Sequence, residues 1–141
     1  MAKLHRIISE RRKVVDFLSQ MKAIFSSESY NPDRDFVFQR CRDKDEPDYE
    51  FTNENTLLAL DYDTSDVVEE LKTLRLDEYS ESMIDNVAEG FNPFYVFGRT
   101  IQGRDVYIKV RLKQRESAPG QFVFCVSFHF ARHPITAHPY K

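Results

Sequence analysis

The chain has 141 residues, of which 41% are hydrophobic and 30% charged, and its formal net charge at pH 7 is −3. This length supports one hydrophobic core, so we expect a single domain over residues 1–141. No apolar run approaches the roughly 20 residues that cross a bilayer, and the first dozen residues lack a signal-peptide pattern, which excludes a helical membrane protein and predicts a cytoplasmic one without a membrane partner.

The first half of the chain begins with apolar residues at three- and four-residue steps over residues 3–25. This spacing predicts an amphipathic helix, which forms most of an N-terminal extension over residues 1–30. Residues 36–39 are typical of a short strand. Residues 40–52 are acidic with interspersed bases around Pro47, which predicts an exposed loop.

Helical patterns continue after this loop. Residues 53–60 indicate a short helix, and residues 64–74 a second one with Thr, Ser and Asp at its start and valines and leucines on one face. Residues 76–83 are compatible with a further turn or short helix. The middle of the chain is therefore expected to be helical.

The last third of the chain changes character, because aromatic and β-branched residues dominate it. They predict three strands, at residues 94–97, 106–112 and 122–130, with glycines 98 and 103 at a turn. Helices followed by strands favour an α+β fold with N-terminal helices packed on a C-terminal antiparallel β-sheet over residues 93–131.

Two of the predicted strands alternate between an apolar and a polar side. The polar side of the first carries Tyr107, Lys109, Arg111 and Lys113. In the second, the phenylalanines and Val126 are expected on one side, and Val123, Cys125, Ser127 and His129 on the other. If residues 114–120 connect the two as a hairpin, Tyr107 lies opposite Ser127, Lys109 opposite Cys125, and His129 diagonal to Tyr107.

Charge is unevenly distributed along the chain. Residues 98–141 contain eight Lys and Arg against two Asp and Glu, a balance of +6, so residues 1–97 carry −9. Such a division predicts a cationic face that attracts phosphate although the whole molecule is anionic.

The polar stripe suits phosphodiester chemistry on RNA. A base removes the proton of the ribose 2′-hydroxyl, cations stabilise the phosphorane, and an acid protonates the leaving 5′-oxygen. Histidine is suited to act as acid or base near neutral pH, which is the role expected of His129, while Lys109 and Arg111 supply positive charge and Tyr107 stacks on a base or hydrogen-bonds a phosphate. This scheme requires no metal or cofactor.

Each of these residues also has an ordinary structural interpretation. Lys and Arg on an outer sheet face commonly serve solubility, Tyr107 packs across strands equally well, and a lone histidine in a strand, such as His129, is structural more often than catalytic. A zinc site is opposed by extended geometry, because Cys125 and His129 are about 13 Å apart along a strand. Only His133 and His138 of the tail could converge on a metal with a third ligand. Two distant cysteines give no disulfide framework.

Five short motifs, which follow one another within residues 35–131, together resemble those of a known protein family. They are LALDYD at residues 58–63, DVVEEL at 66–71, LDEYSESM at 76–83, VYIKV at 106–110 and VSFH at 126–129. Together they resemble the motility quorum-sensing regulator (MqsR) family of toxins. The resemblance implies a RelE-like α+β fold, cleavage of mRNA without ribosome or metal, and neutralisation by a protein antitoxin.

The resemblance also assigns residues. The family's tyrosine and lysine on the penultimate strand fall on Tyr107 and Lys109, and its basic residue after Ser-Phe falls on His129. The chain departs from the family at Glu81, where a lysine is expected, and near Gly98, beside Arg99, where a glutamine is expected.

From these patterns and the resemblance we expect a metal-independent endoribonuclease, the toxin of a type II toxin–antitoxin system, with single-stranded RNA or mRNA and a protein antitoxin as partners. The expected catalytic residues are Lys109, His129 and Tyr107. The residues expected to bind RNA are Arg99, Arg104, Arg111 and Ser127. The alternatives are a non-catalytic module whose basic strand face docks RNA or an acidic protein, and an interface formed by the acidic residues 43–89.

Overall fold

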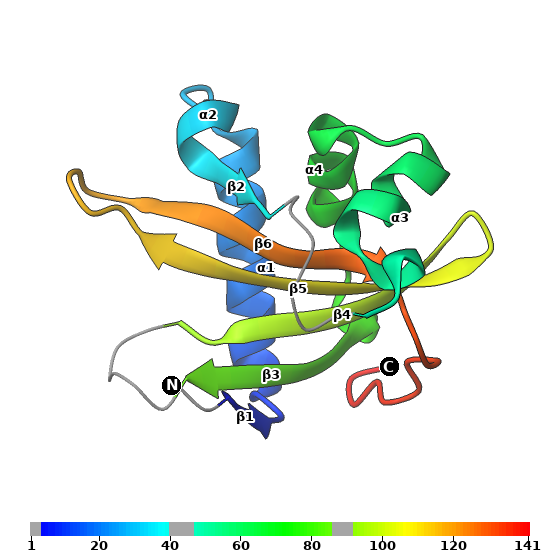
Figure 1. The fold of residues 1–141 in the computed structure, drawn as a ribbon. Helices are drawn as coiled ribbons and strands as arrows, with labels where there is room; N and C mark the ends of the chain where they lie inside the picture. Colours follow the sequence, from blue (N-terminus) through cyan, green and yellow to red (C-terminus); the bar gives the residue numbers. More distant parts are fainter. Residues whose placement is uncertain (1–3, 40–46, 86–91) are drawn as a thin grey trace.

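The computed structural model describes residues 4–39, 47–85 and 92–141, which form a six-stranded sheet with helices against it (Figure 1). The strand order is β1-β3-β4-β5-β6-β2, and every neighbouring pair is antiparallel except β2 and β6, which are parallel. The strands are β1 (Leu4–Ile7), β2 (Phe36–Phe38), β3 (Tyr79–Asp85), β4 (Phe94–Ile101), β5 (Arg104–Gln114) and β6 (Gln121–Phe130). The helices are α1 (Arg11–Ser26), α2 (Pro32–Asp35), α3 (Asn53–Leu60) and α4 (Thr64–Lys72), with 3-10 turns at Tyr49–Phe51 and Leu76–Glu78.

Helix α1 crosses one face of the sheet because its apolar residues recur at helical spacing and form a single stripe. Phe17 of this stripe stacks on Tyr95 of β4 with ring centroids 4.2 Å apart. The apolar row of β5, from Val106 to Leu112, is buried in the same core. We call this side of the sheet the inner face. Side chains of the helices and of the strands pack together on it in one core.

Helices α3 and α4 cover the far end of the same face. The Asp63 side chain caps α4 and forms a capping box with Asp66, which satisfies backbone N–H groups of the first turn. The Asn53 amide of α3 donates to the Val126 carbonyl at 3.0 Å and accepts from the Phe128 N–H at 2.9 Å. These side-chain bonds fasten α3 directly to the backbone of β6.

The structure confirms the α+β class and most of the expected elements. Residues 53–60 form α3, residues 64–72 form α4, and all three strands of the last third are present. The single helix expected over residues 3–25 is wrong at its start, because residues 4–7 pair with β3 as the edge strand β1. The turn or helix expected over residues 76–83 is wrong beyond Glu78, where β3 begins.

The predicted pairing of β5 with β6 is also wrong, because the hairpin closes with Gln114 opposite Gln121, one residue later than expected on β5, and because β6 contains a bulge. Lys109 pairs with Ser127 and Val110 with Cys125, so Val126 is the extra residue. As a result His129 lies directly opposite Tyr107 rather than diagonal to it. The bulge also divides the expected apolar side of β6, since Phe128 joins the inner core while Phe124 packs on the opposite face.

The acidic loop expected over residues 40–52 is only partly described, since residues 40–46 lie outside the described residues together with Cys41. Asp48 and Glu50, which are described, pair with Arg132 at 2.8 Å and Arg104 at 3.2 Å. In the described part of the chain no helix has the length and apolar character needed to span a membrane.

Candidate functional site

The sheet face opposite α1, which we call the outer face, carries a groove of about 560 Å³. Its floor is formed by strands β3 to β6, and its wall by the segment that follows β6. Residues that line the floor are Ser80, Glu81, Val96, Tyr107, Lys109, Ser127 and His129, with Arg6 at the edge. Residues 131–137 form the wall and are called the tail segment below.

Four of the seven residues that the sequence proposed for the site lie on this floor. Tyr107 and His129 are cross-strand partners, and their rings stack with centroids 5.2 Å apart and planes at 18°. The Nδ1–H of His129 donates to the carbonyl oxygen of Phe130 at 3.0 Å, which makes Nε2 the basic nitrogen of the neutral ring. The bulge at Val126 therefore creates the pair that forms the centre of the groove.

Lys109 and Ser127 form the next cross-strand pair, one step along the sheet. The Lys109 ammonium lies 3.8 Å from the Met83 sulfur and 5.3 Å from the centre of the Phe94 ring. These apolar neighbours lower the local dielectric, so the charge acts more strongly on an anion in the groove than it would in bulk water. Lys109 is thus placed to stabilise negative charge beside the Tyr107 and His129 rings.

Strand β4 makes room for the wall of the groove. Gly98, which pairs with Tyr107, lies directly under Ile135 of the tail segment, and a Cβ at this position would be 2.8 Å from Ile135 Cδ1. Any larger residue would displace the tail segment. Beyond it, the Tyr140 ring stacks on Tyr79 with centroids 5.7 Å apart. The tail segment is therefore held against β4 by Ile135, and the residues that follow it are held against β3 by Tyr140.

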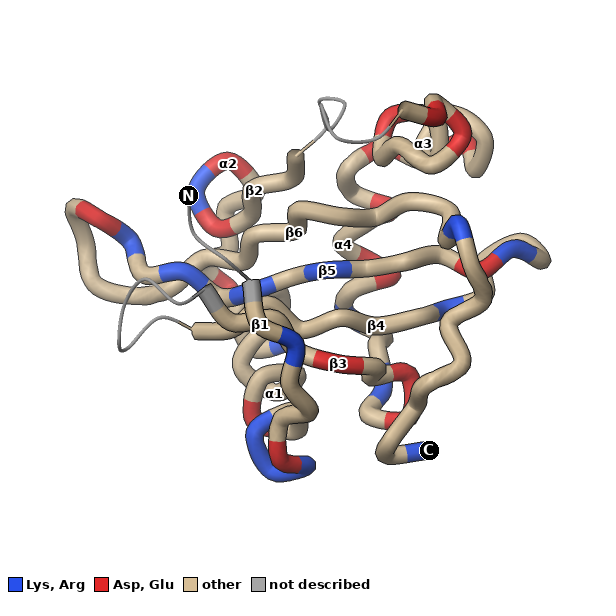
Figure 2. Tube along the Cα trace, turned by 60° about the horizontal axis from the view of Figure 1, so that its bottom comes forward, with Lys and Arg blue, Asp and Glu red and all other residues tan. Residues whose placement is uncertain are grey.

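Charged groups of both signs surround the floor. Figure 2 shows basic positions along β5 and an acidic position on β3. The acidic residue of the groove, Glu81, pairs with Arg6 at 3.6 Å. Burial raises the pKa of Tyr107 to about 12, with a further contribution from the Glu81 carboxylate that Arg6 partly opposes. Tyr107 is accordingly a neutral hydroxyl at physiological pH.

Two arginines that were expected to bind RNA lie outside the groove. The guanidinium of Arg111 is buried, 3.9 Å from the centre of the Phe94 ring, and donates to the Asn92 carbonyl at 3.0 and 2.6 Å. Arg104 stacks on Phe130 at 3.7 Å. Both guanidinium groups are used in these contacts, and neither arginine lines the groove.

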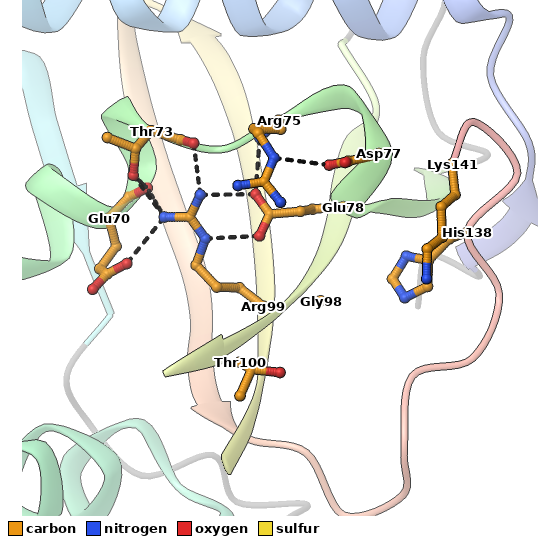
Figure 3. A pocket seen from close by; sticks show the side chains of 10 residues that line it. All are labelled: Glu70, Thr73, Arg75, Asp77, Glu78, Gly98, Arg99, Thr100, His138 and Lys141. Atoms are coloured by element: carbon orange, nitrogen blue, oxygen red, sulfur yellow. Dashed lines mark hydrogen bonds and ion pairs between the residues drawn. The ribbon is translucent and has the colours of Figure 1, made fainter. Parts of the chain in front are cut away.

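Arg99, the third arginine expected to bind RNA, points to the inner face and lines a different pocket, of about 620 Å³ (Figure 3). Its guanidinium pairs with Glu78 at 2.8 Å and with Glu70 at 3.0 Å, and it donates to the Thr73 carbonyl. Burial lowers the pKa of Arg99, but the two carboxylates outweigh burial and raise it overall. This arginine joins α4 to β4 and is saturated by internal partners.

Sequence reasoning missed the other four residues of the groove that have ionisable side chains in addition to Tyr107, Lys109 and His129: Arg6, Glu81 as a lining residue, Arg132 and His133. His133 was considered only as a metal ligand, and the described residues contain no group of three His, Cys, Asp or Glu side chains that could hold a metal ion. Cys125 is buried, and burial raises the pKa of its thiol. No local pattern marks the missed residues, because β1 and the tail segment reach the groove only through long-range packing.

Comparisons with known proteins give no relative from which a function could be transferred. The chain matches no protein-family model, no curated protein and no solved structure. The likeness to MqsR-type toxins rests on the short motifs alone.

Proposed function

We propose that the protein is a metal-independent endoribonuclease that cleaves single-stranded RNA in the outer-face groove. The observation that carries the proposal is the convergence of Tyr107, Lys109, Ser127 and His129 on one floor. These side chains come from two strands, and together they provide a base, a cation, hydroxyl groups and an aromatic ring. The base and the cation supply the proton transfer and charge stabilisation that RNA transesterification needs, and the aromatic ring suits stacking on a nucleobase.

His129 is the base in this proposal. Its ring is held by stacking on Tyr107, and its Nδ1–H is used by the Phe130 carbonyl, so Nε2 accepts the proton of the 2′-hydroxyl. A fixed ring loses little entropy when the substrate binds. The bulge at Val126 is what orients it toward the groove.

Lys109 and Tyr107 act on the phosphate. The Lys109 ammonium stabilises the charge that builds on the nonbridging oxygens as the phosphorane forms. Tyr107 remains protonated because its pKa is about 12, so its hydroxyl donates a hydrogen bond and does not act as a base. Ser127, opposite Lys109, supplies a second neutral hydroxyl.

We further propose that this nuclease is the toxin of a type II toxin–antitoxin system with a RelE-like fold. The support is the order of the short motifs that resemble the MqsR family, together with an α+β sheet whose outer face carries the catalytic candidates. A protein antitoxin would then neutralise the enzyme by covering the groove.

The test is incubation of the purified protein with a long single-stranded RNA in EDTA, followed by mapping of the ends. We expect discrete cuts with 2′,3′-cyclic phosphate and 5′-hydroxyl ends. Lys109→Ala and His129→Ala should each lower the cleavage rate roughly 100-fold or more, as loss of a charge-stabilising or proton-transfer group does.

Lys113→Ala is the matched control, because Lys113 is on the same strand and face as Lys109 but lies over Phe124, away from the groove. It should cleave at the wild-type rate. Intact RNA with the wild-type protein, or full activity in both groove variants, would contradict the nuclease proposal.

A second function has one observation in its favour. Arg132 at the rim of the groove already binds a carboxylate, that of Asp48, at 2.8 Å. The cationic side chains of the groove are thus suited to bind acidic side chains of a protein partner as well as phosphates. Salt-sensitive binding of RNA or of an acidic protein without any cleavage product would favour this binding module over the nuclease.

A further inference from the structure

In the proposed reaction His129 is the base and Lys109 stabilises charge, and the general acid is still unassigned. Cleavage of RNA by its own 2′-hydroxyl also requires a proton for the leaving 5′-oxygen. Two floor residues are poor donors for this step. The pKa of Tyr107, about 12, makes its phenol a weak acid. Glu81 is engaged with Arg6, and it lies on β3, three strands and about 14 Å from β6.

The wall of the groove contains a second imidazole. His133 lies four residues after His129, beyond the end of β6, and both line the same groove. Its segment is fixed on both sides. The Ala131 N–H donates to the Asp105 carbonyl of β5 at 2.8 Å, and Ile135 rests on Gly98 of β4.

These two attachment points determine the path of the segment. Four residues span at most about 14 Å, so the chain from Ala131 to Ile135 is a short bridge from its contact with β5 to its contact with β4. Gly98 pairs with Tyr107, and Tyr107 pairs with His129, so Ile135 lies over the same row of the sheet that carries the stacked rings. His133 is midway along this bridge and lines the wall of the groove.

We propose that His133 is the general acid of the groove and that it works as a pair with His129 across the bound phosphodiester. This inference rests on the proposed nuclease function. The two imidazoles come from different structural parts, one from the strand floor and one from the tail segment. The packing of Ile135 on Gly98 positions the second of them.

The proposed step is balanced as follows. Neutral His129 takes the proton of the 2′-hydroxyl, and O2′ forms a bond to phosphorus. The bond from phosphorus to O5′ breaks, and O5′ takes a proton from the His133 imidazolium. The products are a 2′,3′-cyclic phosphate and a 5′-hydroxyl, and both histidines return to their starting protonation by exchange with water.

The test compares two substrates with one sequence, a normal RNA and an RNA with sulfur in place of the bridging 5′-oxygen at the cut site. A thiolate leaves without protonation, so an enzyme that lacks only its acid recovers on the sulfur substrate. We expect His133→Gln to cleave normal RNA roughly 100-fold more slowly than wild type and the sulfur substrate at close to the wild-type rate. His129→Gln should remain impaired on both substrates.

His5→Gln is the matched control, because His5 is an exposed histidine of β1 that lies outside the groove. It should behave as wild type, and far-UV circular dichroism should show that all three variants are folded. If His133→Gln cleaves normal RNA at the wild-type rate, or is equally impaired on both substrates, His133 is not the acid. A wild-type protein that cleaves neither substrate would instead overturn the nuclease function on which the inference rests.

Discussion

At the scale of single residues, Tyr107 shows how the outer face determines the chemistry available to the groove. Its ring is covered by His129, and burial together with the Glu81 carboxylate raises the pKa of its hydroxyl to about 12. An ionised phenolate at this position would lack solvation and would face a like charge. The residue therefore offers a hydrogen-bond donor over the whole physiological pH range.

Removing the carboxylate should make this effect visible. We expect Glu81→Gln to lower the pKa of Tyr107 below about 12, because one of the two causes that raise it is then absent. The measurement is an ultraviolet titration of tyrosine ionisation, with Tyr107→Phe to identify the signal. Glu69→Gln, an exposed change on α4, is the control and should leave the titration unchanged.

The same raised pKa has a consequence for stability. The stabilising contribution of protonated Tyr107 is fully present below pH 10, about the pKa of an unfolded tyrosine, and is lost as the pH rises through about 12. Tyr107→Phe should therefore remove part of the alkaline loss of unfolding free energy. A variant with an unchanged alkaline profile would show that the Tyr107 ring is not buried in solution as described.

Prediction of the site from the sequence succeeded on β5, where the directions of Tyr107 and Lys109 follow from strand alternation alone, whereas Ser127 and His129 share this face through the bulge in β6. Tyr107, Lys109, Ser127 and His129 were predicted to share a face, and they line one groove. Arg99 was selected by charge, but charge in a sequence does not reveal whether a guanidinium meets solvent or buried carboxylates. That outcome depends on Glu70 and Glu78, which approach it only in the folded chain.

At the scale of elements, the tail segment can lie against β4 because Gly98, the residue under Ile135, has no side chain. The contact between Ile135 and Gly98 leaves no room for a Cβ. We expect Gly98→Val to displace the tail segment, with a loss of about 1–2 kcal/mol of apolar packing and a roughly tenfold faster opening of this segment.

Hydrogen–deuterium exchange of residues 131–141 is the measurement, and Ile135→Ala in the Gly98→Val background should restore part of the protection by removing the clash. Thr100→Val, an exposed change on the same strand, is the control. Unaltered exchange in Gly98→Val would mean that Ile135 does not hold the tail segment.

The elements that the sequence did not predict share a physical cause. Residues 4–7 have no strand signal of their own and become β1 only by pairing with β3. Strand β3 lacks clear alternation because its pairing with β4 shifts between Tyr79 and Glu81. The bulge at Val126 is likewise a property of the β5 and β6 pair. Local patterns predicted the helices and central strands, whereas edges and irregularities are set by partners distant in sequence.

At the scale of the whole molecule, a protein with net charge −3 presents a groove with three cationic residues, Arg6, Lys109 and Arg132. RNA binding should weaken as salt increases. If these three groups contact phosphates, the logarithm of the binding constant should fall with the logarithm of the salt concentration with a slope of about −2 for single-stranded RNA.

Fluorescence anisotropy with a labelled oligonucleotide and the His129→Ala protein, which does not consume the ligand, measures this slope. Lys109→Ala should make the slope shallower by a little under one, and Lys113→Ala should not change it. A slope near zero would mean that phosphate charge is not recognised by this face.

The parallel pairing of β2 with β6 and the placement of the groove wall after β6 have a further consequence for synthesis on the ribosome. The amino-terminal half emerges first, yet β2 has no neighbour until β6 is made, and β1 none until β3 is made. The groove acquires its wall only when residues 131–137 appear. A nascent chain therefore carries no complete groove until residues 131–137 have been made.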